Sequence, residues 1–144
     1  MLGARGSPMR GLTVAKVVLT IAAAYGGVGS YIADWNATHI HNPAWPPHAK
    51  FHNAQSMSLG AALLLITAGV LWRRPALSRA ELGLGAVLAS TYGATQLSAL
   101  LYPGTALVDP PSRGSGPQGL IAAGLLVLSA GAYLIGSRGL RAGR

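Results

Sequence analysis

The sequence predicts an all-α protein, a single four-helix transmembrane bundle with both termini in the cytoplasm. Its 144 residues are 51% hydrophobic and 10% charged, whereas a typical soluble domain carries about 25% charged residues. Four apolar segments are each long enough to cross a bilayer core, which takes about 20 helical residues. If all four segments span the membrane, nine of the eleven Lys and Arg residues fall on one side, and such an excess marks the cytoplasmic side.

The first segment covers about residues 11–33. A signal peptide is an alternative interpretation, because a basic stretch precedes the segment and Ala22–Ala24 resemble a cleavage region. The apolar run continues to Ala33, however, and is longer than the usual signal-peptide core of about 7–15 residues. A membrane span is therefore the preferred interpretation.

The second segment covers about residues 49–72 and follows a proline-rich loop. Pro43, Pro46 and Pro47 lack backbone donors and favour extended geometry in the residues before them. The loop should therefore be stiff and irregular. The helix can begin at Pro47 or His48, because proline is tolerated in a first turn.

The third and fourth segments cover about residues 80–102 and 117–136. Ser78 and Glu81 have the spacing of a capping box, which predicts the start of the third helix. Pro103-Gly104 should end it. Small residues at every fourth position allow helix backbones to approach closely in lipid, and they occur as Gly26 and Ser30, as Gly85, Ala89 and Gly93, and as Gly119 and Ala123.

The basic residues also bear on orientation and on partners. Only Lys50 and Arg113 fall on the side opposite the other nine, so stretch 34–52 and loop 102–116 should share the extracytoplasmic face. The net charge of +8 does not indicate a nucleic-acid-binding protein, because the basic residues end apolar runs instead of forming a stripe with aromatic residues. The chain contains no cysteine, which excludes disulfides and thiol catalysis.

The stretch from Asp34 to His52 holds the residues best suited to chemistry. It contains all four histidines, His39, His41, His48 and His52, and one of only three acids. A carboxyl partly withdrawn from water can hold a proton, and imidazole can act as an acid or a base near neutral pH. We therefore expect Asp34 and His52 to be the main catalytic pair, with His39 and His48 assisting.

Other interpretations of these residues stay open. His48 and His52 have the i, i+4 spacing of helical zinc ligands, and with His39 and His41 they could build a metal site. No glutamate stands between them, and Lys50 on the same turn would disfavour a cation. Asp34 could instead be an interfacial acid that pairs with Lys50. No cofactor is predicted.

The expected substrate-binding residues come from the same stretch and from the third segment. A glutamine in a transmembrane helix usually faces the bundle interior and needs a partner. Gln96 shares a helix face with Tyr92, so the two residues could form the floor of a pocket or simply join helices. Asp109, Gln118 and Tyr133 are further candidates. The main set is Trp35, Asn36, Trp45, Asn53, Tyr92 and Gln96.

Two motifs carry a resemblance to a known family. They read D-W-N-x-T-H at residues 34–39 and N-P-x-W-P-P-H-A-x-F-H at residues 42–52. They look like the signature of small four-helix membrane proteins of bacteria and fungi, a largely uncharacterised family. Some of these proteins resemble, in turn, the integral membrane hydrolases and cyclases that open epoxides in polyketide and terpenoid pathways. The layout also resembles sterol isomerases of the emopamil-binding type, whose catalytic glutamates we cannot align here.

The acid–base residues and the resemblance together suggest a function. We expect a membrane enzyme that opens an epoxide in a lipophilic small molecule, by hydrolysis or cyclisation. A double-bond isomerase or a terpene cyclase would use similar groups. Alternatives from other classes are a non-catalytic membrane binding or accessory protein and the histidine-ligated metal site. The expected partners are the lipophilic substrate and membrane lipids, and a homo-oligomer is left open.

Overall fold

The computed structural model describes residues 8–108 and 116–142. Within these residues the chain forms helices and turns and no strand, and four helices are long and apolar enough to cross a membrane. The prediction of an all-α fold with four candidate spans is therefore confirmed.

The first span is one helical rod in three parts. α1 (Pro8–Ala24) continues through a π-helical turn, η1 (Tyr25–Gly29), into the short α2 (Ser30–Asp34). The remaining elements are α3 (Pro47–Trp72), α4 (Arg79–Ser98) with a 3-10 turn η2 (Ala99–Leu101) after it, and α5 (Pro117–Ala142).

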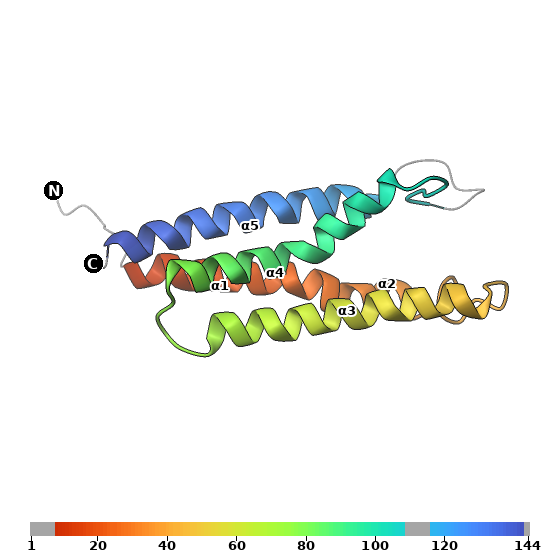
Figure 1. Cartoon of the computed structure of the whole chain (residues 1–144), viewed down its shortest axis with the longest axis horizontal. Coiled ribbons are helices and arrows are strands. Elements are labelled where there is room, and N and C mark those ends of the chain that lie inside the picture. Colours follow the sequence, from red (N-terminus) through yellow and green to blue (C-terminus); the bar gives the residue numbers. More distant parts are fainter. Residues whose placement is uncertain (1–7, 109–115, 143–144) are drawn as a thin grey trace.

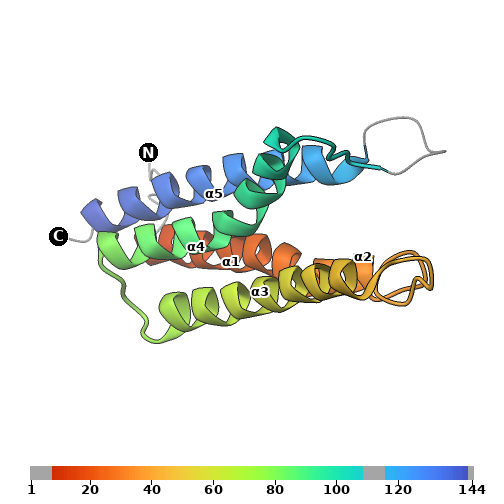
Figure 2. The same cartoon turned by 45° about the vertical axis from the view of Figure 1, so that its right-hand side comes forward.

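The four long helices lie side by side along the long axis of the molecule (Figure 1). The start of α1, the end of α5 and the connection 73–78 lie at one end of the bundle. The loop 35–46 and the segment 102–108 lie at the other end, where α4 turns away from α3 towards α5 (Figure 2). This arrangement is the up-and-down topology expected of four successive spans.

Several helix boundaries differ from those expected. α5 does not end near Gly136 but continues to Ala142. A Cβ at Gly136 would clash with Leu82 and Ala15, so this glycine allows close packing against α4 and α1 and does not mark the end of the helix. α1 begins at Pro8, earlier than expected. α3 begins at Pro47, as the tolerance of proline in a first turn predicted.

The start of α4 confirms the predicted capping box. The Ser78 hydroxyl accepts a hydrogen bond from the backbone N–H of Glu81 at 3.2 Å, and the Glu81 carboxylate accepts from the backbone N–H of Ser78 at 2.7 Å. The same carboxylate also pairs with Arg73 and Arg74. These contacts fix the turn between α3 and α4.

α1 lies at the centre of the bundle and contacts α3, α4 and α5. Its buried side chains include Leu12, Leu19 and Lys16. The Lys16 ammonium donates to the carbonyls of Arg74 and Pro75, each at 2.9 Å, so it satisfies acceptors that follow the end of α3. A buried lysine thereby joins the first span to the second.

Small residues bring the helix backbones together near the middle of the bundle. A Cβ added to Gly60 of α3 would lie 2.0 Å from the carbonyl oxygen of Gly26, so the two backbones are in direct contact there. The small residues of α4 at positions 85, 89 and 93 are buried as expected. On α5 the expected contact at Ala123 is wrong, because that residue is exposed and its neighbour Ala122 is the one that faces α4.

Candidate functional site

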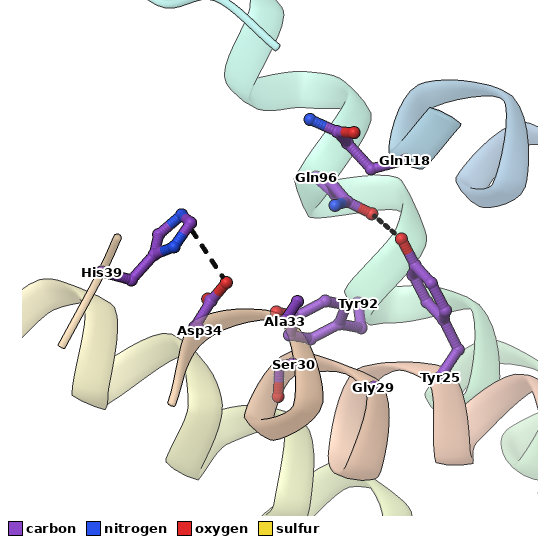
Figure 3. A pocket seen from close by; sticks show the side chains of 9 residues that line it. All are labelled: Tyr25, Gly29, Ser30, Ala33, Asp34, His39, Tyr92, Gln96 and Gln118. Carbon is purple, nitrogen blue, oxygen red and sulfur yellow. Dashed lines mark hydrogen bonds and ion pairs between the residues drawn. The ribbon is translucent and has the colours of Figure 1, made fainter. Parts of the chain in front are cut away.

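A pocket of about 370 Å³ lies at the loop end of the bundle, between the first span, α4 and the start of α5 (Figure 3). Its volume falls within the range of small-molecule sites, about 300–1,000 Å³. The residues that line it are Tyr25, Gly29, Ser30, Ala33, Asp34, His39, Tyr92, Gln96 and Gln118.

Asp34 is the last residue of α2, and its side chain is 21% exposed. The Asn53 amide of α3 donates a hydrogen bond to Oδ2 at 2.8 Å. The other oxygen, Oδ1, lies 3.8 Å from Nε2 of His39. That distance is too long for a direct hydrogen bond, so an oxygen atom of water or substrate can bridge the two groups.

The proton on the neutral His39 ring can be assigned from its neighbours. The Thr38 hydroxyl donates its only hydrogen to Oδ1 of Asn36 at 2.6 Å. The same hydroxyl oxygen lies 2.9 Å from Nδ1 of His39, so it must accept from an Nδ1–H. Nε2 of the neutral ring therefore carries a lone pair, and it faces Asp34 (Figure 3).

The loop that carries His39 is folded by its own side chains. The Asn36 amide donates to the Ala33 carbonyl and accepts from the backbone N–H of Thr38, and Asn42 accepts from the backbone N–H of Ala44. Both asparagines therefore stabilise turns of the loop through local hydrogen bonds and do not line the pocket. The Trp45 ring packs edge-on against the His39 ring, with centroids 5.3 Å apart, and supports it from outside the pocket.

α4 contributes the opposite wall. The Tyr25 hydroxyl donates to Oε1 of Gln96 at 3.1 Å (Figure 3), so the amide nitrogen of Gln96 is available to donate into the pocket. The Tyr92 ring lies edge-on to Tyr25, with centroids 6.3 Å apart. Tyr92 and Gln96 thus line the pocket from α4, together with Gln118 from α5.

Tyr25 is the aromatic residue of the pocket that the sequence did not indicate, and the small residues Gly29 and Ala33 also line the pocket without having been predicted. Tyr25 precedes Asp34 by nine residues, and in a regular α-helix of about 3.6 residues per turn this spacing places two side chains about half a turn apart. The π-helical turn at Tyr25–Gly29 is wider, with i to i+5 hydrogen bonding, and rotates Tyr25 towards the face of Asp34. The only sequence signal was the Gly26-Gly27 pair with Gly29, which weakens a regular helix.

The expected pairing of Asp34 with His52 is not formed. His48 and His52 lie on the exposed first turns of α3 and do not line the pocket. His41 packs edge-on against the exposed ring of Trp35, with centroids 5.4 Å apart, and Trp35 is also outside the lining. Among the described residues no three His, Asp or Glu side chains come close enough to hold a metal ion, so the four-histidine site is not formed either.

Two further candidates lie elsewhere. Tyr133 lines an apolar groove between α4 and α5, away from Asp34. Asp109 falls outside the described residues. Asn53 does not line the pocket but supports it through its hydrogen bond to Asp34.

Residues 18–144 match the model of a family of unknown function (DUF6640). The chain belongs to this family. The matched range contains both sequence motifs and every residue that lines the pocket. No curated protein and no solved structure matches the chain. For this DUF6640 member, the chemistry of the pocket residues is therefore the basis for assigning a function.

Proposed function

We propose that the protein is an integral membrane enzyme that opens an epoxide in a lipophilic small molecule by acid–base catalysis. Asp34 and His39 are the catalytic pair, with His39 in the place that the sequence suggested for His52. The observation that carries the proposal is the lone pair of His39 Nε2 facing the Asp34 carboxylate across 3.8 Å. The two groups lie close enough to exchange a proton through one bridging oxygen atom.

The pair can hold that proton on either side. With the proton on His39, the imidazolium is a general acid and the Asp34 carboxylate is a general base. Epoxide opening needs an acid to protonate the ring oxygen and a base to activate the attacking oxygen. The two groups at this pocket wall can supply both.

The proposed reaction uses both groups in one step. A water molecule loses a proton to Asp34 while its oxygen attacks an epoxide carbon. The carbon–oxygen bond of the ring breaks, and the epoxide oxygen takes the proton from His39 Nε2. The product is a vicinal diol, and the proton on Asp34 returns to His39 through a bridging water. When the substrate carries its own hydroxyl, that oxygen replaces water and the product is a cyclic ether.

Gln96 is positioned to bind the substrate oxygen. Its Oε1 is already occupied by the Tyr25 hydroxyl, so its N–H groups can donate to the epoxide oxygen as negative charge develops there. The location of the pocket supports a lipophilic substrate, because the lining residues come from the ends of candidate membrane spans and from the loop beside them.

The orientation of the chain is part of the proposal. Arg10, Arg73, Arg74 and Arg138 lie at the end of the bundle away from the pocket, and basic residues favour the cytoplasmic side. The pocket and the loop 35–46 would then face the extracytoplasmic side.

Turnover in oxygen-18 water tests the reaction. Purified protein in detergent is incubated with a panel of lipophilic epoxides, and diols are measured by mass spectrometry. We expect one oxygen-18 atom per diol. Asp34→Asn and His39→Gln should each lower the rate by about 100-fold or more, the range found for loss of general acid–base groups.

His41→Gln is the matched control, because His41 lies two residues from His39 in the same loop but outside the pocket. It should retain full turnover. Diol formation that survives in both the Asp34 and His39 variants would remove these residues from the mechanism. Absence of diol with every epoxide of the panel, from a folded protein, would remove epoxide hydrolysis.

A further inference from the structure

His48 and His52 form a second cluster of chemistry-bearing side chains, outside the pocket. Both lie on the exposed side of the first two turns of α3. Their Nε2 atoms are 3.1 Å apart, whereas their ring centroids are 4.5 Å apart. The two rings therefore turn their Nε2 atoms towards each other.

Gln55 determines where the proton of His52 lies. Its Oε1 is 3.2 Å from Nδ1 of His52, and because an amide oxygen only accepts, Nδ1 carries the hydrogen. Nε2 of the neutral His52 ring is then the acceptor, and Nε2–H of His48 donates to it across 3.1 Å. A metal ion that replaces this hydrogen would be held by both Nε2 atoms. Histidines that bind metals have this arrangement, with the second ring nitrogen held by an outer hydrogen bond.

The spacing of the two nitrogens fits one shared ion. With metal–nitrogen bonds of about 2.0–2.1 Å, the observed 3.1 Å separation corresponds to a nitrogen–metal–nitrogen angle of about 100°. This angle lies between about 90° for square-planar and about 109° for tetrahedral coordination.

The neighbouring side chains support the two rings and keep positive charge away from them. Neutral imidazole is the form of histidine that binds metals. The Phe51 ring stacks on His48, with centroids 6.1 Å apart, and contacts His52 edge-on at 5.4 Å. Lys50, two residues from each histidine, projects from the opposite side of the helix.

We propose that His48 and His52 bind one divalent transition-metal ion, such as Zn²⁺, through their Nε2 atoms, with water in the remaining coordination positions. Imidazole donors suit zinc, copper and nickel rather than calcium or magnesium. The site is separate from the pocket of Asp34 and His39, so its failure would leave the proposed function unaffected.

Calorimetric titration of Zn²⁺ into the full chain in detergent, purified without a histidine tag, tests the proposal. We expect one ion per chain, with affinity at least 10-fold weaker in His48→Gln and in His52→Gln. His41→Gln is the control and should bind like the natural chain. Gln55→Leu should weaken binding by a few-fold, because it removes only the outer hydrogen bond.

Thermal unfolding gives a second readout that is independent of any activity. Zinc should raise the midpoint for the natural chain and for His41→Gln, since a ligand of the folded state stabilises it, and should leave the midpoint of the double variant of His48 and His52 unchanged. The substituted side chains are exposed, so all variants should unfold alike without metal. Equal zinc affinity in the natural chain and the double variant would overturn the site, as would an equal loss in His41→Gln.

Discussion

Thr38 decides which nitrogen of His39 carries the proton, because its hydroxyl oxygen is the acceptor for Nδ1–H. We predict that Thr38→Val lowers turnover by about 5-fold, since losing a hydrogen bond of about 1 kcal/mol lets the ring adopt the other tautomer or rotate. Thr38→Ser keeps the hydroxyl and should restore most of the rate. The pH dependence of kcat distinguishes this positioning role from a loss of folding. An unchanged pH profile in the valine variant, or a serine variant as slow as valine, would contradict it.

At the residue scale the sequence predicted which residues share a pocket better than it predicted which of them face each other. Asp34, His39, Tyr92 and Gln96 were all candidates and all line one pocket. The choice of His52 over His39 was wrong in geometry, because i, i+4 spacing says that His48 and His52 share a helix face but not where that face points. The direction of His39 depends on hydrogen bonds made by Asn36 and Thr38 in an irregular loop, and such a path has no periodicity to read.

At the scale of elements, the contact between the first span and α3 depends on two glycines. A Cβ on Gly60 would lie 2.0 Å from the Gly26 carbonyl oxygen. We predict that Gly60→Ala destabilises the protein by about 1–3 kcal/mol, the usual cost of overpacking. Gly69→Ala is the matched control on the same helix, because a Cβ there meets nothing within 4 Å, and alanine is the better helix former.

Thermal unfolding in detergent measures both variants. Gly60→Ala should also weaken turnover, since the displaced helix carries Asn53, whose amide holds Asp34. Gly69→Ala should keep both stability and rate. If the two substitutions cost the same, close backbone contact at Gly26 and Gly60 is not what holds these helices together.

The positions of the four helices could be predicted from the sequence, but the π-helical turn within the first span could not. Apolar runs of about 20 residues, the prolines and the capping box predict most boundaries directly. The π-helical turn at Tyr25–Gly29 arises where Gly26 and Gly27 press against Tyr92 and Leu64 of other helices. A tertiary contact of that kind overrides local propensity, so the sequence alone does not reveal that Tyr25 and Asp34 share a pocket.

At the scale of the whole molecule, the pocket end and the arginine-rich end are at opposite ends of the bundle. The chain has no cysteine, so a single introduced cysteine reports the side on which it lies. Ala37, in the pocket-end loop, and Ala76, in the connection between α3 and α4, are both exposed. They form a matched pair for Ala37→Cys and Ala76→Cys.

With a membrane-impermeant maleimide on intact cells, we predict labelling of Ala37→Cys but not of Ala76→Cys, because the basic residues around position 76 favour the cytoplasmic side. Both variants should label after the membrane is opened with detergent, which controls for reactivity. The opposite pattern would place the Asp34–His39 pocket on the cytoplasmic side. Labelling of both variants in intact cells would mean that α3, the one candidate span between positions 37 and 76, does not cross the membrane. That result would contradict the four-span topology. The orientation matters for function, because it decides from which leaflet a lipophilic epoxide would reach the pocket.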